Sequence, residues 1–389
     1  MRRLTPIAAA AAAAGALALG ALPTAAARPL GSTPITPGLR SPLSTMATRS
    51  AAGSLAAAPV PAAAGRAPRL TTLSTAVVAP FQLAFAGHRL FIADGGTAKI
   101  SRLNGRSLGT VVAGAPGVEG IGVNGRGEIA YSQANENMGT ATLTIVHPGG
   151  RRVVAGLAAF EKAHNPDGRV TYGVPHPSAC VAAYLKSQNT PPNQTGDVHS
   201  NPYAVIPFRA GWWLVADAGG NDILKVSPTG VVSVATVLPR QATVITAALA
   251  ASLQAPPCVV GVTFYSQPVP TDLQFGPSGK LYVSTLSGAI AAGTVYTVDV
   301  RRHTSRLLAS GFVGATNLAV TPREVVYVAD AKAGTISRIY RGRTTTVVRL
   351  ANVLSLQFDA GVLYAGTAAP GILQEGPPTG PGSLVRISF

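Results

Sequence analysis

Internal repetition constrains the fold of this 389-residue chain more than any other feature. Three segments align without gaps, each with an apolar strand ending in Ala-Asp, a Gly-bearing turn, and a second strand that carries a basic residue. These segments are 91–102, 214–225 and 327–338. Weaker copies begin at Leu281 and Val362. A short strand of alternating apolar residues precedes each copy, and a further strand follows most of them.

Units of four strands that recur about every 40 residues are typical of the blades of a β-propeller. The 43 Gly, 31 Pro and 12% charged residues suit many short strands joined by tight turns. First strands begin near residues 80, 117, 200, 268, 313 and 353. Seven blades and a two-sheet sandwich are the alternatives, although regular four-strand units fit a sandwich poorly. The sequence therefore predicts an all-β, six-bladed β-propeller, similar in blade plan to NHL and YWTD propellers.

The two ends of the repeat region predict how the ring closes. The last repeat stops at Phe389 after its third strand, whereas Leu70–Val78 is a strand-forming segment with no repeat of its own. If Leu70–Val78 completes the last blade, no sheet edge remains unpaired at the junction. We therefore expect a single propeller domain over residues 70–389, with its last blade closed by the N-terminal strand.

The first 69 residues predict export. A basic pair, Arg2-Arg3, precedes an apolar run over 7–22 and the small residues 25–27, so residues 1–27 resemble a secretory signal peptide. The apolar run, of about 16 residues, is short for a membrane span, which needs about 20, but an uncleaved anchor is the alternative. Residues 28–69 are rich in Ala and Pro and predict a disordered linker. We expect a secreted or cell-envelope protein with no transmembrane span after signal cleavage.

The chain carries 31 Lys and Arg against 15 Asp and Glu, a net charge of +16. The basic residues are scattered singly or in pairs, without a long run and without interleaved aromatic residues, which argues against nucleic acid as a partner. Arg-rich, Lys-poor usage fits the codon bias of a high-GC genome. A loose attraction to anionic polymers of the cell envelope fits the scattered charge better.

The two cysteines, Cys180 and Cys258, lie in two insertions that break the repeat, 157–199 and 240–267. In an exported chain an even pair favours a disulfide. A metal site is the alternative, although neither cysteine has a partner at ligand spacing. The insertions also predict helices over Leu157–His164, around Cys180 and over Thr243–Leu253. Loops grafted on a rigid scaffold are where binding usually resides.

Several motifs in and around the insertions resemble a known family. They lie at Ala159–Gly168, Ser200–Tyr203, Val215–Asp222 and Val269–Asp272. In these motifs, and over roughly residues 75–389, the chain resembles the ScyD/ScyE family of exported propeller proteins, which is common in actinobacteria. Ala204 stands where relatives tend to have Gly. The family has no settled activity, so the resemblance implies fold and export and transfers no catalytic residue.

Polar residues that open the innermost strands are the candidate binding site, because these positions surround the mouth of a propeller's channel. They are Gln82, Glu119, Tyr203, Thr271, Asp272 and Asn317. These residues differ from blade to blade, whereas a purely structural position tends to carry the same residue in every repeat. A polar ligand or Ca²⁺, which takes oxygen ligands, fits such a set, and simple solvation of the mouth is the alternative. No other cofactor is predicted.

Recurrent acid–base pairs in the hairpins receive a structural interpretation. The acids are Asp94, Asp217 and Asp330, and the bases are Arg102, Lys225 and Arg338. An Asp before a Gly turn can cap the hairpin by accepting backbone N–H bonds, and its partner can form a cross-strand charge pair. Acid–base chemistry is the alternative. His164, His176 and His199 share the first insertion, but their spacing matches no known zinc pattern.

The sequence thus predicts a non-catalytic binding or scaffold protein that takes a small molecule, glycan or protein, most simply on the face with the insertions. The alternative is a metal-dependent hydrolase resembling lactonase-like or strictosidine-synthase-like propellers, with Glu119 and Asp272 as its carboxylates. A purely structural envelope protein is a third reading. The sequence has no nucleophile elbow, no Gly-rich phosphate loop opening a helix and no Cys–His nucleophile pairing.

Overall fold

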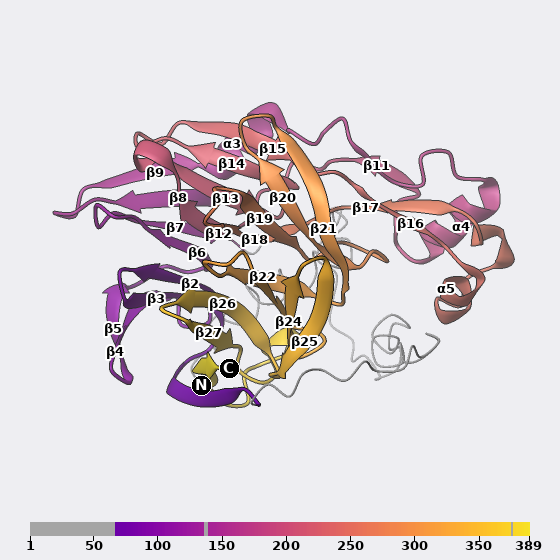
Figure 1. Ribbon diagram of the computed structural model, residues 1–389. Helices are drawn as coiled ribbons and strands as arrows, with labels where there is room; N and C mark the ends of the chain where they lie inside the picture. Colours follow the sequence, from indigo (N-terminus) through magenta and orange to yellow (C-terminus); the bar gives the residue numbers. More distant parts are fainter. Residues whose placement is uncertain (1–66, 136–138, 375) are drawn as a thin grey trace, which may run out of the picture.

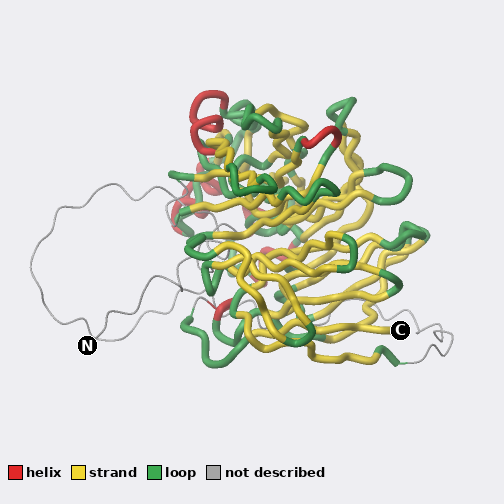
Figure 2. Tube along the Cα trace, turned by 90° about the vertical axis from the view of Figure 1, so that its left-hand side faces the viewer, coloured by secondary structure: helices red, strands yellow, loops and turns green. Residues whose placement is uncertain are grey.

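Six four-stranded antiparallel sheets surround a common axis in the computed structural model, which describes residues 67–135, 139–374 and 376–389 (Figure 1). The inner strand of each sheet contacts the inner strands of two neighbouring sheets, so the six inner strands form a closed ring. Figure 2 shows the same strands from the side. The predicted six-bladed β-propeller is confirmed. The predicted signal peptide and nearly all of the predicted linker lie outside the described residues.

The strands follow the repeat pattern, and blades 1 to 5 run from the inner to the outer strand in chain order. Blade 1 contains β2 (Pro80–Ala86), β3 (Arg89–Asp94), β4 (Lys99–Asn104) and β5 (Ser107–Val112). Blade 2 contains β6 (Val118–Val123), β7 (Ile129–Ala134), β8 (Ala141–Val146) and β9 (Arg152–Gly156). Blade 3 contains β12 (Pro202–Pro207), β13 (Trp213–Asp217), β14 (Asp222–Val226) and β15 (Val232–Val237). Blade 4 contains β18 (Pro270–Phe275), β19 (Leu281–Thr285), β20 (Gly293–Asp299) and β21 (Thr304–Phe312). Blade 5 contains β22 (Ala315–Val320), β23 (Val326–Asp330), β24 (Thr335–Tyr340) and β25 (Arg343–Arg349).

Blade 6 closes the ring by joining the two ends of the repeat region. Its first three strands are β26 (Val353–Asp359), β27 (Val362–Thr367) and β28 (Gly382–Ser388), and its outer strand is β1 (Arg69–Val77). β1 pairs antiparallel with β28, with Leu70 opposite Ile387. The N-terminal strand therefore occupies the place predicted for it, and the β-structure begins at Arg69, one residue before the expected boundary.

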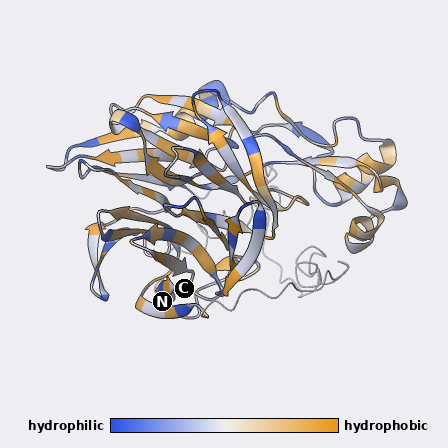
Figure 3. Ribbon diagram, viewed as in Figure 1, coloured by the Kyte–Doolittle hydropathy of each residue, from blue (hydrophilic) through white to orange (hydrophobic). Residues whose placement is uncertain are grey.

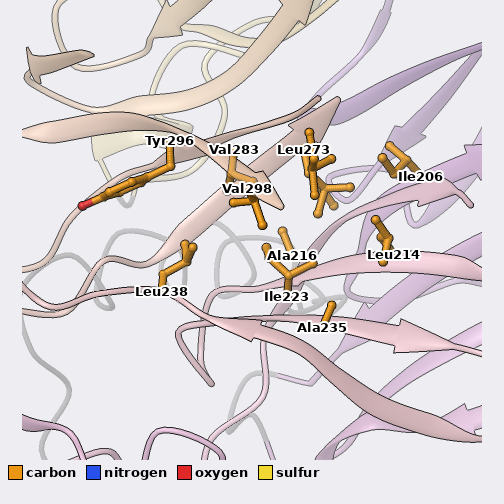
Figure 4. Close-up of a cluster of buried hydrophobic side chains, with 12 residues drawn as sticks. Ile206, Leu214, Ala216, Ile223, Ala235, Leu238, Leu273, Val283, Tyr296 and Val298 are labelled. Atoms are coloured by element: carbon orange, nitrogen blue, oxygen red, sulfur yellow. The ribbon is translucent and has the colours of Figure 1, made fainter. Parts of the chain in front are cut away.

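Apolar side chains fill the space between adjacent blades. One cluster joins Leu214 and Ile223 of blade 3 to Leu273 and Val283 of blade 4, all four with no exposed surface (Figure 4). Burial of such side chains is the main favourable contribution to folding, and it makes each blade depend on its neighbours. In Figure 3, hydrophobic residues recur along the strands of the blades.

The two insertions fold together into a lobe that projects from the ring, at the right of Figure 1. Its small sheet contains β10 (Thr171–Gly173), β11 (Asn193–Thr195), β16 (Gln241–Val244) and β17 (Thr263–Ser266), in the order β11-β10-β17-β16. Two helices, α4 (Ala179–Ser187) and α5 (Ala247–Ser252), complete it. The predicted disulfide is present and joins Cys180 in α4 to Cys258. Each insertion lies between the outer strand of one blade and the inner strand of the next, so both leave the ring on one face.

The helices of the insertions were predicted with mixed success. Helix α3 (Leu157–His164) has the predicted bounds. The predicted helix over Thr243–Leu253 is wrong in its first part, because Thr243 and Val244 belong to β16 and pair with β17. β-Branched residues favour this extended backbone. The helix begins only after Thr246, whose side chain accepts a hydrogen bond from Leu249 N–H as an N-cap.

The disulfide is expected to stabilise the lobe rather than the ring. The lobe has its own small core, which includes Val181 and Phe264, and the bridge links residues 78 positions apart. In a variant with Cys180→Ser and Cys258→Ser, we expect the local stability of the lobe to fall by about 2 kcal/mol. Hydrogen exchange should then accelerate in α4 and α5 and stay unchanged in β13 and β19. Uniform loss of protection across the blades would contradict this assignment.

Across the portion of the chain covered by the structure, none of the helices combines the length and the apolar character that a membrane crossing requires.

Candidate functional site

The structure brings the six predicted site residues together at the starts of the inner strands, where each is at most 5% exposed. The strand register is interrupted at this level in all six blades. Such irregularities re-aim side chains, and here they direct polar groups toward neighbouring blades. The predicted set is therefore a buried ring of polar groups. It is not the solvated channel mouth that was the alternative.

Gln82 of blade 1 is the hub of this ring. Its Oε1 accepts hydrogen bonds from the backbone N–H groups of Ile121 in blade 2, at 2.7 Å, and Val205 in blade 3, at 2.9 Å. Its Nε2 donates to the Val205 carbonyl and to Asp272 Oδ1 in blade 4, both at 3.2 Å. One side chain thus links four of the six blades.

The remaining contacts close the circle. Asp272 Oδ2 accepts from Leu318 N–H of blade 5 at 3.1 Å, and Asn317 Oδ1 accepts from Leu356 N–H of blade 6 at 2.8 Å. The Ser355 hydroxyl of blade 6 donates to the Pro80 carbonyl of blade 1 at 2.6 Å. We call this chain of contacts through Gln82, Asp272, Asn317 and Ser355 the inter-blade belt. Both oxygens of Asp272 are engaged in it.

Thr271 and Tyr203 have packing roles beside the belt. The Thr271 hydroxyl donates to the Ala315 carbonyl at 2.9 Å, which is a further link between blades 4 and 5. The Tyr203 ring packs edge-on against Phe81, with ring centroids 5.6 Å apart, in an apolar cluster that includes Val269 and Leu354. We call this cluster the apolar plug. It lies at the starts of the inner strands, where the sequence predicted a polar mouth.

A cavity of about 200 Å³ lies beyond the belt, along the later residues of the inner strands. Gln82 and Gln274 line it together with Gly122 and Phe275. Ligand pockets for drug-sized molecules are usually about 300–1,000 Å³, so this channel is small. Its lining offers amide groups and aromatic edges, without a basic side chain.

Two carboxyl groups of the predicted site have strongly raised pKa values. Burial raises the pKa of Glu119 to about 8, and the nearby Asp217 carboxylate adds to the effect. Burial also raises the pKa of Asp272 to about 8, although hydrogen bonds from Leu318 and Gln82 oppose it. Perturbed carboxyl groups are candidate acid–base groups. Glu119 Oε2 has no hydrogen-bond partner within the described residues, so of these two carboxyl groups only Asp272 takes part in the inter-blade belt.

The recurrent hairpin acids accept backbone hydrogen bonds. Asp330 accepts from the N–H groups of Val313, Gly314 and Ala333, at 2.7–3.1 Å, and Asp94 and Asp217 make corresponding contacts. The expected cross-strand charge pairs are wrong. Arg102 lies opposite Phe91, Lys225 opposite Leu214 and Arg338 opposite Tyr327, because a basic residue eight positions after the Asp lies three pairs away from it.

Sequence reasoning missed a group of buried carboxyl groups where α3 meets blade 3: Glu161, Asp167 and Asp222, beside Asp217. Burial raises the pKa of Glu161 to about 8, with Asp217 and Asp167 adding to the effect. Burial also raises the pKa of Asp222, and that of Asp167 to about 6. The Tyr172 hydroxyl and the Asn221 amide donate to Asp167 Oδ2. The sequence held one signal for this group, because Asp222 stands where the other aligned repeats carry Lys99 and Thr335.

The zinc alternative for His164, His176 and His199 finds no support in the described part of the chain. Within the described residues, no set of three or more His, Cys, Asp or Glu side chains converges on one metal position.

No family model and no curated protein matches this chain. Solved structures with a similar fold include a gluconolactonase from Xanthomonas campestris, at 14% identity and a TM-score of 0.51 over 82% of this chain and 89% of that one. Another is the PQQ-bound aldose sugar dehydrogenase of Streptomyces coelicolor, at 11% identity and a TM-score of 0.51 over 82% of this chain and 98% of that one. Likeness at this identity extends to the fold alone, and fold does not assign function. The chain therefore shares the β-propeller architecture of these proteins.

Proposed function

We propose that this chain is an exported, non-catalytic β-propeller of the ScyD/ScyE kind that binds anionic polymers of the cell envelope through its basic surface. The observation that carries the proposal is the separation of charge between interior and surface. Nine of the fifteen acidic residues are buried within the described residues: Asp94, Glu119, Glu128, Glu161, Asp167, Asp217, Asp222, Asp272 and Asp330. No described Lys or Arg is buried.

The surface is consequently more basic than the net charge of +16 suggests. Only two of the described Lys and Arg side chains form salt bridges, Lys280 with Glu324 and Arg302 with Asp299. The other cations in the described part of the chain have no carboxylate partner and are at least partly accessible to solvent. A surface that carries an excess of one sign of charge attracts polyanions and accelerates their association.

Four exposed arginines lie on the outer hairpin of blade 5. Arg338, Arg341, Arg343 and Arg349 are all exposed on β24, β25 and the turn between them. The Arg341 guanidinium lies 5.2 Å from the centre of the exposed Tyr340 ring. We call these four arginines the blade 5 basic edge. Charged residues on an outer strand also discourage unwanted strand pairing, which is the structural alternative.

The inter-blade belt and the apolar plug support a binding role over hydrolysis at the channel mouth. A hydrolase of the expected kind needs carboxylate oxygens that face a substrate. Asp272 instead has both oxygens in hydrogen bonds between blades, and Phe81 and Tyr203 pack over the starts of the inner strands. The favourable polar contacts of this region are used to hold the blades together.

A binding assay tests the proposal. The mature chain should be retained on immobilised polygalacturonate, a carboxylate polymer, and not on neutral dextran, and retention should weaken steeply as salt screens the charges. Replacing the blade 5 basic edge with four glutamines should weaken binding by about tenfold, because each contact of this kind contributes a few tenths of a kcal/mol.

The matched control replaces four dispersed arginines, Arg89, Arg126, Arg152 and Arg386, all of which are exposed. It removes the same charge and should weaken binding less. Failure of the wild-type chain to bind polygalacturonate at low salt would overturn the proposal. Much tighter binding to duplex DNA of equal charge would also overturn it, in favour of a nucleic-acid partner.

A further inference from the structure

Glu161 and Asp222 approach each other in the interior without any partner among the described residues. Both residues have no exposed surface, and none of their four carboxylate oxygens accepts a hydrogen bond. Glu161 Oε2 and Asp222 Oδ1 lie 3.3 Å and 3.5 Å from the point that a Cβ on Gly220 would occupy. The two carboxyl groups therefore border one small space, which exists because residue 220 has no side chain.

Comparison with the other blades singles out Asp222. In blade 1 the residue opposite Asp94 is Lys99, and in blade 5 the residue opposite Asp330 is Thr335. In blade 3 the residue opposite Asp217 is Asp222. Like charges directly opposite each other destabilise a strand pair. Among these three blades, the one that carries this repulsion is also the one on which α3 packs Glu161.

Glu161 faces the blade because of its position in α3. Leu157 and Glu161 are the two buried residues of the helix, four positions apart and hence on one face. Leu157 packs in the apolar cluster with Val215 and Leu224 of blade 3. No salt bridge within the described residues involves Glu161 or Asp222. Buried carboxyl groups are normally paired or coordinate a metal.

We propose that Glu161 and Asp222 hold a hard divalent cation, Ca²⁺ or Mg²⁺, in the space beside Gly220. Such cations prefer carboxylate, carbonyl and water oxygens. The two carboxylates supply the charge, and water oxygens complete the coordination. The cation ties α3, at the start of the first insertion, to the turn between β13 and β14. It thereby fixes the insertion on blade 3.

This site is separate from the predicted channel-mouth site and from the blade 5 basic edge. Its ligands come from α3 and the β13–β14 hairpin, whereas Asp272 and Asn317 belong to inner strands. Binding of an anionic polymer does not depend on it, so each proposal can fail without the other.

The test uses the mature chain, freed of metal with EDTA and then titrated with Ca²⁺, Mg²⁺ or Zn²⁺ separately. We expect one Ca²⁺ or Mg²⁺ to bind per chain by calorimetry and to raise Tm by about 3 °C or more at millimolar concentration. Absence of binding by both ions, or a response to Zn²⁺ alone, would overturn the proposal.

Three variants locate the cation. Glu161→Gln and Asp222→Asn keep the shape of the side chains and should weaken binding by more than about tenfold, because each removes a charged ligand. Gly220→Ala should also weaken binding, because its methyl group enters the space bordered by both acids and residue 220 does not have a positive φ.

Asp197→Asn is the matched control, since Asp197 lies in the same insertion and contributes charge near Asp167 without joining the buried pair. This variant should keep the cation response. Equal responses in wild type, Glu161→Gln and Asp222→Asn would show that the cation binds elsewhere, and would refute the assignment.

Discussion

Replacing Gln82 with alanine is expected to lower the free energy of unfolding by about 4 kcal/mol, since it leaves several buried polar groups unpaired and opens a cavity. The groups that lose their partner are Ile121 N–H, both backbone groups of Val205, and Asp272 Oδ1. These belong to three blades besides that of Gln82. Urea unfolding followed by fluorescence and circular dichroism measures the loss.

Gln357→Ala is the control for this prediction. Gln357 also lines the channel, but it is only partly buried. Its Nε2 makes a long contact of 3.4 Å to the Leu83 carbonyl, and among the described residues its Oε1 accepts a hydrogen bond only from the adjacent Phe358 N–H, at 3.0 Å. We expect this variant to lose less than about 1 kcal/mol, because solvent replaces the contact. Similar losses in the two variants would contradict the view that Gln82 is a hub.

The belt shows why the fold could be predicted from the sequence and the role of the channel residues could not. The repeat reports contacts within a blade, such as the pairing of Ala93 with Ile100, which recurs as Ala216 with Ile223. The belt consists of contacts between blades. Gln82 and Val205 are 123 positions apart, and no local pattern signals that they meet. From the sequence alone, varied polar residues at one level of the strands therefore predict a binding site.

Ring closure was predictable for a different reason. Leu70–Val78 is strand-forming but belongs to no repeat, and the last repeat lacks one strand, so a single physical requirement pairs them. The pairing of Thr71 with Arg386 follows from that requirement. The register shifts after Thr72, by contrast, depend on how β1 bends around the blade, which the sequence does not report.

The acidic pair Glu161 and Asp222 could be predicted from the sequence only in part. That Asp222 stands where the repeat has Lys99 and Thr335 can be read from the aligned segments alone. That it meets Glu161 cannot, because α3 precedes blade 3 by a long insertion. A residue that breaks a repeat at a position opposite a like charge therefore signals a buried acidic pair, although it does not reveal the second partner.

Glu119→Gln is expected to remove part of the pH dependence of stability. Burial, with the Asp217 carboxylate adding to it, raises the pKa of Glu119 from 4.5 to about 8 in the folded chain. Between these values the folded chain keeps a proton that the unfolded chain has released, so the free energy of unfolding falls as pH rises. One such group contributes a slope of about 1.4 kcal/mol per pH unit. The variant lacks this contribution, because an amide side chain does not titrate in this range.

In urea titrations between pH 4.5 and 8.5, the free energy of unfolding of the wild-type chain should fall more steeply with pH than that of Glu119→Gln. The difference in slope should be about 1.4 kcal/mol per pH unit, the contribution of one proton. The two should have similar stability near pH 4.5, and at pH 8 the variant should be more stable by about 4 kcal/mol. Glu324→Gln is the control. Hydrogen bonding by Ser278 and the charge of Lys280 lower the pKa of Glu324, so this group titrates below pH 4.5. Its replacement should therefore leave the pH dependence of stability between pH 4.5 and 8.5 unchanged. Parallel curves for wild type and Glu119→Gln would show that Glu119 is ionised in the folded chain. The raised pKa of Glu119, caused by its burial, thus predicts that this group favours the folded ring of blades most at mildly acidic pH.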